Sequence, residues 1–202
     1  MRHLPLLGTL LAFALFVYAT SLYPGGTRLD PTTIGYSWGE NTISALFQPF
    51  AVNGEVNPAR WYAIVAVFIF CFSIGMVFQQ IAQITQAEPH QNWIRVAGVS
   101  TVVFAFLVVT PLHHVMVTFA LICFLAAALA LTHWLYLRSY RGLLVLGIVA
   151  ISLPVLNAVL FYGQLYPQWL LMVQKSGQLA AFIWLFAVYY LATHQSRETN
   201  QL

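Results

Sequence analysis

The stretch PARWYAIVAVFIFCFSIGMVFQQIAQI (residues 58–84) is apolar apart from a few polar side chains. A helix crosses the hydrocarbon core of a bilayer with about 20 mostly apolar residues, at about 1.5 Å per residue. The stretch therefore predicts a membrane-spanning helix. The whole chain agrees, since 60% of its 202 residues are hydrophobic and only 6% are charged, against roughly 25% charged in soluble domains. The sequence predicts an integral membrane protein.

Working outward from this stretch, the same criteria predict six spanning helices, at residues 5–23, 58–84, 94–112, 115–137, 143–161 and 169–192. The connections after the first are short, so consecutive helices should be antiparallel neighbours. We therefore expect an all-α fold: a single domain, residues 1–202, built as an integral membrane bundle of six transmembrane helices.

The first span has an alternative interpretation. Arg2, an apolar run and then Ala19-Thr20-Ser21 are also typical of a signal peptide with a small-residue cleavage site. The run continues to Tyr23, longer than the usual apolar segment of a signal peptide, which favours a retained helix. Either interpretation leaves the following loop on the same side.

The positive charges predict the orientation, because Lys and Arg are enriched on the cytoplasmic side of membrane proteins. One side carries Arg2, Arg95, Arg138, Arg141 and Arg197, and the other carries Arg28, Arg60 and the intramembrane Lys175. We expect both termini to be cytoplasmic, the long loop of residues 24–57 to lie outside, and the membrane to be a bacterial inner membrane.

Two helix starts are predicted around the long loop. Ser37-Trp38-Gly39-Glu40 fits a capping box, and the apolar positions that follow approximate one helix face, so we expect an interfacial lid helix over residues 38–50. Asn57 before Pro58 predicts the N-cap of the second spanning helix. Much of the loop is explained by these helix signals alone.

Several polar side chains are predicted to reach the outer side. Lys175 lies about 9 Å below the outer end of the last span, where a charge needs a partner or an aqueous route. Glu40 is its most economical counter-ion. We expect an outward-facing polar pocket, with catalytic candidates Glu40, His113, His114 and Lys175 and with ligand-binding candidates Trp38, Asn41, Ser44, Arg60, Trp61, Asn157 and Gln178. Each also has a structural interpretation, as a cap, a solvated charge or an interfacial side chain.

No metal or cofactor is expected. His90, His133 and His194, with Glu88, come from separate elements near the inner interface and lack tight ligand spacing, so we interpret them as interfacial histidines. Cys71 and Cys123 each lie in an apolar run and are interpreted as packing residues. Eight Lys and Arg residues against five acids are dispersed along the chain, which argues against nucleic acid as a partner.

The loop motifs carry a resemblance. Tyr23-Pro24-Gly25-Gly26, Gly35-Tyr36-Ser37-Trp38 and Asn57-Pro58-Ala59-Arg60 resemble a pattern in uncharacterised bacterial multi-pass membrane proteins. They resemble more loosely the six-helix family catalogued as domain of unknown function 998. The resemblance implies a six-helix fold and no particular activity.

A second resemblance concerns chemistry. Asn41-Thr42-Ile43-Ser44 is similar to a segment early in the alkaline ceramidases, membrane hydrolases that hold a zinc ion with three histidines. Here the outer side has only the adjacent His113 and His114, so the resemblance does not supply a zinc site.

We expect a protein that binds a lipid or another amphiphile, or a membrane partner or second copy, at the outer pocket. The alternative is a membrane-embedded hydrolase or transferase acting on a lipid-like substrate from the outer face, with a turn histidine as base and Lys175 at the oxyanion. A small transporter ranks third, because the spans carry almost no charges and the chain has no internal repeat.

Overall fold

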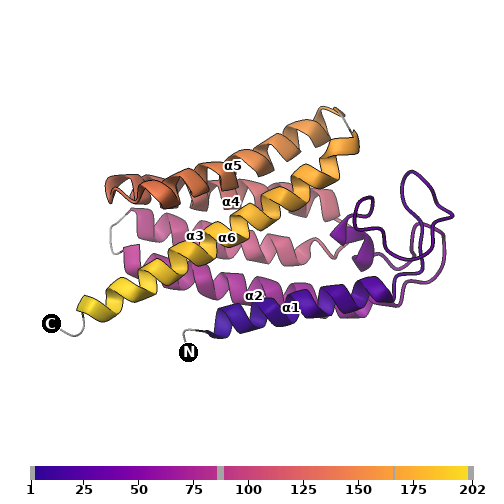
Figure 1. Cartoon of the computed structure of the whole chain (residues 1–202), viewed down its shortest axis with the longest axis horizontal. Coiled ribbons are helices and arrows are strands. Elements are labelled where there is room, and N and C mark those ends of the chain that lie inside the picture. Colours follow the sequence, from indigo (N-terminus) through magenta and orange to yellow (C-terminus); the bar gives the residue numbers. More distant parts are fainter. Residues whose placement is uncertain (1–2, 86–88, 166, 200–202) are drawn as a thin grey trace. The chain divides into compact units, whose positions relative to one another are not determined.

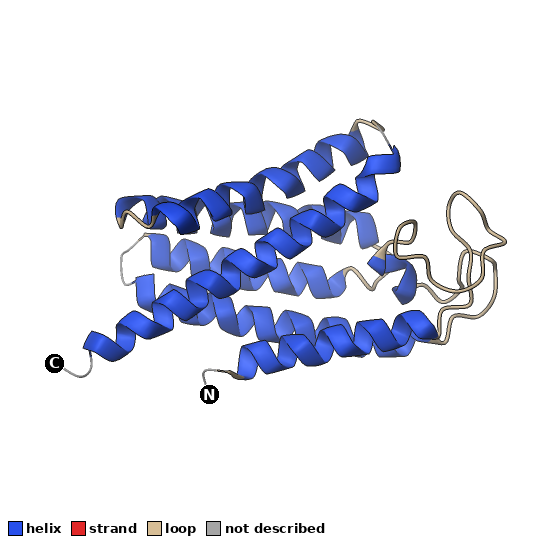
Figure 2. Cartoon of the chain, viewed as in Figure 1, coloured by secondary structure: helices blue, strands red, loops and turns tan. Residues whose placement is uncertain are grey.

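A computed structural model of the chain describes residues 3–85, 89–165 and 167–199. In that part of the chain the elements follow one another as α1 (Leu4–Ser21), the 3₁₀ helix η1 (Ile43–Phe47), α2 (Ala59–Thr85), α3 (His90–Leu107), α4 (His113–Leu137), α5 (Arg141–Tyr162) and α6 (Pro167–Thr199) (Figure 1). Figure 2 shows helices and loops over the described residues, and two isolated antiparallel bridges, Gly25–Ile34 and Phe50–Val56, lie between α1 and α2. The predicted all-α fold is confirmed.

Five helices are long and apolar enough to cross a membrane: Leu4–Ser21, Ala59–Thr85, His113–Leu137, Arg141–Tyr162 and Trp169–Leu191. The chain is an integral membrane protein. α3 forms where a span was predicted, but it begins with three polar residues, contains Arg95 and ends at Leu107, five residues short of the predicted end. Its apolar part, residues 96–107, covers only about 18 Å, against about 30 Å of hydrocarbon. The sixth span therefore stays a prediction.

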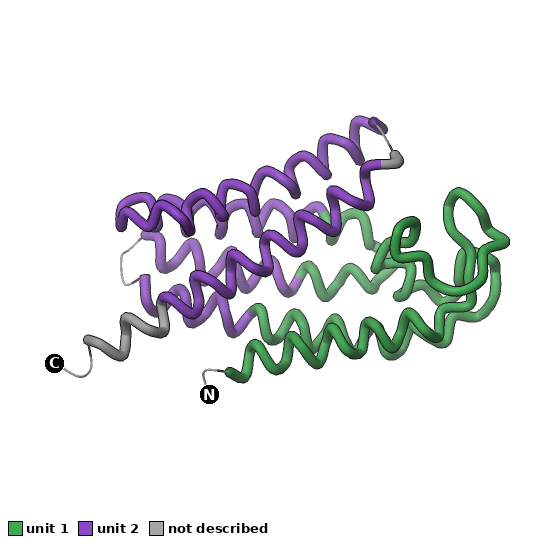
Figure 3. Tube along the Cα trace, viewed as in Figure 1, with its two compact units in different colours: residues 1, 3–74, 104–117 green, residues 2, 75–103, 118–202 purple. Residues whose placement is uncertain are grey.

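The chain forms two compact units (Figure 3), which we describe separately. Unit 1 contains residues 3–74 and 104–117. Within it α1 packs on the first half of α2: Gly8 lies so close to Ser73 that a Cβ would collide with its hydroxyl. Tyr18 and Tyr62 meet edge to face, with ring centroids 5.0 Å apart. A small residue at one end of the pair of helices and an aromatic contact at the other hold them together.

Unit 2 contains residues 75–103 and 118–202, apart from those not described, and its packing centres on Trp184 of α6. This side chain is fully buried, and its indole N–H donates to the carbonyl oxygen of Leu143 at 3.0 Å. It lies against Gly147 of α5, where an added Cβ would stand 2.9 Å from the indole. At Gly177 of α6 an added Cβ would stand 3.3 Å from Cδ of Pro154 of α5. Glycines thus let α5 and α6 approach closely.

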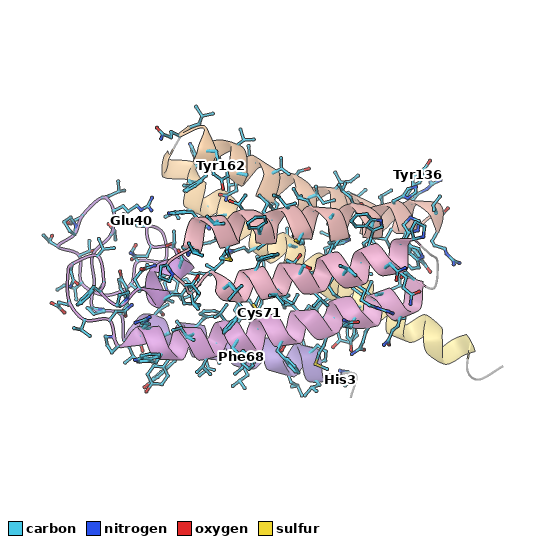
Figure 4. All side chains as sticks on the ribbon, turned by 180° about the vertical axis from the view of Figure 1, so that it is seen from behind. His3, Glu40, Phe68, Cys71, Tyr136 and Tyr162 are labelled. Carbon is cyan, nitrogen blue, oxygen red and sulfur yellow. The ribbon has the colours of Figure 1, made fainter. Side chains whose placement is uncertain are left out.

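Figure 4 shows aromatic side chains at both ends of unit 2, with Tyr136 near the end of α4 and Tyr162 at the end of α5. Both are exposed, at 65% and 60%. Aromatic residues at opposite ends of a helical bundle are typical of the two membrane–water interfaces. Cys71 is buried and Cys123 is half-buried, and both are free thiols, as expected for packing residues.

Candidate functional site

The α1–α2 loop (residues 22–58) is an ordered structure built around two adjacent glycines. Gly25 and Gly26 have φ of +149° and +87°, conformations that only glycine adopts without strain. The amide of Gly26 donates to the carbonyl oxygen of Thr33 at 2.8 Å, which closes a short hairpin, and the amide of Asn53 donates to that of Gly25 at 3.3 Å. The double glycine therefore joins two separate parts of the loop.

Asp30 forms the tip of this hairpin and is fully solvated. Its carboxylate accepts hydrogen bonds from the hydroxyl and the amide of Thr32, at 2.7 and 2.8 Å. These two bonds hold the pKa of the Asp30 carboxyl below its usual value, and the bond from the Thr32 hydroxyl has the larger effect. Its role is to shape the turn before Pro31.

Three aromatic side chains support the loop from within. Tyr23 is 3% exposed, and its hydroxyl accepts from the amide of Val52 at 3.1 Å. Tyr36 lies edge-on to Tyr23, and Trp38 lies edge-on to Tyr36, with centroid distances of 5.7 and 5.3 Å. Burial raises the pKa of Tyr36, whose hydroxyl donates to the carbonyl oxygen of Asn41 at 3.3 Å. Trp38, at 54% exposed, is the open end of this aromatic row.

The predicted capping box at Ser37 and Glu40 is wrong. The amides of Glu40 and Asn41 donate to the Ser37 carbonyl oxygen in an isolated turn, and the helix begins only at Ile43. Thr42 is its N-cap, because it is extended and its hydroxyl accepts from the amide of Ala45 at 3.2 Å. The lid helix is accordingly η1, five residues long. Gln48 is forced into an extended conformation before Pro49, which ends it.

The three polar candidates of this segment have separate surroundings. Asn41 is 3% exposed. Its side-chain nitrogen donates to the carbonyl oxygen of Gly26 at 2.9 Å, and its side-chain oxygen accepts from the backbone amide of Ser37 at 2.8 Å. Both ends of the Asn41 side chain are therefore bonded within the loop, which gives this residue a structural role rather than a ligand-binding one. The hydroxyl of Ser44 is paired with that of Thr42 at 2.9 Å. Glu40 is exposed on the loop (Figure 4).

Asn57 performs the predicted capping and a second role that the sequence did not indicate. Its side-chain oxygen accepts from the amide of Ala59 at 3.1 Å, at the start of α2. Its amide nitrogen donates to the carbonyl oxygens of Ala45, Leu46 and Gln48, at 3.4, 3.2 and 2.9 Å. One buried side chain therefore closes the end of η1 and opens α2, which fixes η1 against the first turn of α2.

Arg60 and Trp61 lie on this first turn of α2. The guanidinium carbon of Arg60 is 5.2 Å from the centre of the Trp61 ring, within cation–π range. Nε of Arg60 is buried and has no hydrogen-bond partner among the residues that the structure describes. Trp61 is 67% exposed. The pair presents a cation with an unused donor beside an open aromatic face at the end of a membrane-spanning helix.

His113 and His114 start α4, next to the turn after α3. Nδ1 of His113 donates to the carbonyl oxygen of Val108 at 2.9 Å, which caps the end of α3 and leaves Nε2 without a proton in the neutral ring. The two rings meet edge to face at 5.2 Å, and His114 is exposed. His113 has a structural role in the turn, and its Nε2 has no hydrogen-bond partner among the described residues.

The remaining candidates belong to unit 2. Lys175 is half-buried and Gln178 is exposed, on either side of the buried Gly177. Asn157 lies three residues after Pro154 of α5, and its side-chain oxygen is buried with no hydrogen-bond partner among the described residues. Because Glu40 and Arg60 belong to unit 1, the convergence of all these groups in one pocket stays a prediction.

A metal centre does not fit the part of the chain that is described. Nowhere in it do three or more His, Cys, Asp or Glu side chains lie close enough to hold an ion. The donor set of a three-histidine zinc site is therefore not assembled from these residues. Glu88 and the side chain of His194, which the sequence places near His90 and His133, lie outside the described residues.

Local sequence patterns did not indicate that His90 and His133 form a pair. Nε2 of His90 lies 2.8 Å from Nδ1 of His133. A signal was present. The midpoint between positions 90 and 133 falls at the turn between α3 and α4, so antiparallel helices bring the two positions level.

Comparisons with protein-family models, curated proteins and solved structures found no match to this chain.

Proposed function

We propose that this chain is a bacterial inner-membrane protein that binds the anionic headgroup of a lipid or similar amphiphile at Arg60 and Trp61, on the outer face, with both termini in the cytoplasm. The excess of Arg on the opposite side of the membrane supports this orientation. The exposed Trp61 at the start of a spanning helix suits the level of the headgroups, where amphipathic rings are enriched.

The observation that carries the proposal is the buried Nε of Arg60, which has no acceptor among the described residues. A buried donor left unpaired costs about 1–3 kcal/mol, and more when the group is charged. A phosphate or carboxylate oxygen provides the acceptor and neutralises the guanidinium, and the acyl chains of the same molecule pack beside the Trp61 ring. An anionic amphiphile matches both halves of this pair.

The loop supplies the rigidity that such a site needs. Asn57 fixes the first turn of α2 against η1 through four hydrogen bonds, so the backbone that carries Arg60 is held in place before a ligand arrives. A group held in its binding geometry loses less conformational entropy on association.

The test is thermal unfolding of the purified chain in detergent, with added phosphatidylglycerol or phosphatidylcholine. We expect stabilisation by phosphatidylglycerol only, and binding by Arg60→Gln weakened about tenfold or more, because a hydrogen bond to a charged group contributes about 1.5–3 kcal/mol. Arg60→Lys should keep only part of the affinity for phosphatidylglycerol, since an ammonium group lacks the planar fork of donors of a guanidinium. Arg28→Gln removes an equal charge from an exposed position of the α1–α2 loop and is the control.

Equal stabilisation of the wild type and Arg60→Gln by phosphatidylglycerol would sink the proposal. So would an equal loss in Arg28→Gln, because the effect would then be one of net charge.

A second candidate is a membrane hydrolase with His113 as general base. It is favoured by one observation, the hydrogen bond from Nδ1 to Val108, which orients the ring and leaves Nε2 available to take a proton. Hydrolysis of a lipid ester or amide by the wild type, lost in His113→Gln, would favour this candidate; equal turnover by both proteins would remove it.

A further inference from the structure

The pair formed by His90 and His133 lies in unit 2, near the start of α3 and near the end of α4. Nε2 of His90 and Nδ1 of His133 are 2.8 Å apart, and the ring centres are 5.0 Å apart. His133 is exposed and His90 is half-buried. Nδ1 of His90 is buried and has no hydrogen-bond partner among the described residues. The two rings share one hydrogen bond between very different surroundings.

Counting protons identifies the form that this geometry permits. Two neutral imidazoles carry two N–H groups on four nitrogens, and one of these hydrogens must stand in the bridge. If the other is on Nε2 of His133, it faces water. If it is on Nδ1 of His90, it is buried without an acceptor, which is costly. The neutral pair therefore has Nε2–H of His90 donating to Nδ1 of His133.

A further proton has no suitable position. Three N–H groups with an intact bridge require hydrogens on Nε2 of His133, in the bridge and on Nδ1 of His90, whichever ring carries the charge. The last of these is the buried atom that has no acceptor among the described residues. Protonation therefore works against the hydrogen bond, and the chain relieves the conflict by separating the rings.

The charged groups that the described side chains bring to this end of unit 2 are all cations: Arg95 on α3, Arg138 on α4 and Arg141 at the start of α5. The part of α2 in this unit, residues 75–85, carries no titratable group. Glu88 and the α6 side chains of His194, Arg197 and Glu198 lie outside the described side chains.

We propose that the hydrogen bond between His90 and His133 is a pH-sensitive latch, which holds the start of α3 against the end of α4 while both rings are neutral and opens when the pair takes up a proton. A histidine ordinarily gains its charge somewhere between about pH 5 and 8, so the latch is closed while both rings are neutral and opens as the pH falls through this range. The device uses residues of unit 2, none of which belongs to the proposed headgroup site, and it works without a ligand.

A metal ion in place of the bridging hydrogen meets the same obstacle. An ion bound to Nε2 of His90 leaves the ring hydrogen on Nδ1, where it is buried without an acceptor. The proton count thus favours the hydrogen-bonded latch over a two-histidine metal site.

Hydrogen exchange of the full chain in nanodiscs, at pH 7.5 and 5.5, tests the latch. After correction for intrinsic rates, exchange in residues 93–97, the first amides of α3 with helical hydrogen bonds, should rise about fivefold at the lower pH in the wild type, the loss expected for one hydrogen bond. His133→Asn keeps an acceptor near the position of Nδ1 and leaves His90 as the one ring of the pair that can take up a proton, so its exchange should rise less at the lower pH than that of the wild type. His133→Ala should exchange fast at both pH values, and His3→Gln, which removes an exposed histidine elsewhere, should behave as the wild type.

Three results would overturn the latch. One is equal pH dependence in the wild type and His133→Asn. Another is slower exchange of the wild type on addition of Zn²⁺, absent in His133→Ala, which would make the pair a metal site. The third needs no variant: ¹⁵N resonances of the wild type at pH 7.5 should show His90 protonated at Nε2 and bare at Nδ1, and the opposite tautomer would refute the proton count.

Discussion

Gly26→Ala should open the α1–α2 loop, and the cost follows from the geometry of one residue. Gly26 has φ of +87°, and a Cβ there would meet the amide nitrogen of Asn53 and stand 2.8 Å from the carbonyl carbon of Val52. The left-handed conformation costs an alanine about 1–2 kcal/mol. Displacing a packed neighbour typically adds about 1–3 kcal/mol. Because the obstacle is backbone, it moves only if the adjoining bond from Asn53 to Gly25 is lost.

Gly35→Ala is the matched control. Gly35 belongs to the same hairpin and has φ of +73°, but its Cβ would find nothing within 4 Å. It therefore shares the conformational cost and lacks the collision. The two variants should differ by about 1–3 kcal/mol, which is about fivefold to a hundredfold in the equilibrium for opening the loop.

Trypsin cleavage after Arg28 measures this equilibrium, because cleavage requires the hairpin to open. The rate of cleavage therefore follows the population of the open loop. Cleavage should be fastest in Gly26→Ala, intermediate in Gly35→Ala and slowest in the wild type. Equal rates for the two variants would refute the argument, because the collision with residues 52 and 53 would then carry no energy.

Three further predictions concern other parts of the chain. Asn57→Ala should lower the free energy of unfolding by about 2–4 kcal/mol in a thermal unfolding assay, because it removes a cap and leaves carbonyl groups of η1 without a donor. Asn57→Asp should be no more stable than Asn57→Ala, since a carboxylate would face those carbonyls, and recovery of stability with Asp would contradict this. Gly98→Ala should cost about 1–3 kcal/mol, because its Cβ would stand 2.5 Å from Cδ1 of the buried Phe78; Phe78→Leu should reduce that cost, and an additive double mutant would show that the two do not collide. The Asp30 turn should be present above the ordinary pKa of an aspartate and lost as pH falls through the lowered value; Thr32→Val should raise that pKa in an NMR titration, and an unchanged pKa would exclude the Thr32 hydroxyl as its cause.

Local sequence signals predicted the structure where one strong local effect acts. The apolar runs predicted the helices, since about 20 apolar residues have few alternatives to a spanning helix. Asn57 before Pro58 predicted a helix start, because the cap bond joins residues two apart in the chain. The same reasoning failed at Ser37, whose backbone amide donates to the side-chain oxygen of Asn41 and not to Glu40. The side-chain nitrogen of Asn41 donates to Gly26, 15 positions away, and no local pattern contains that contact.

The sequence by itself determined that this is an all-α membrane protein with one long polar loop, because hydrophobic burial depends on composition and run length, which are local properties. Only the tertiary structure decided what the polar residues of that loop and of the helix ends do. It turned Asn41 inward, joined Asn57 to η1, stacked Arg60 on Trp61 and brought His90 within 2.8 Å of His133. A hydrogen bond depends on distance and direction between atoms, and where the partners lie far apart in the chain these are fixed only when the helices and the loop have packed.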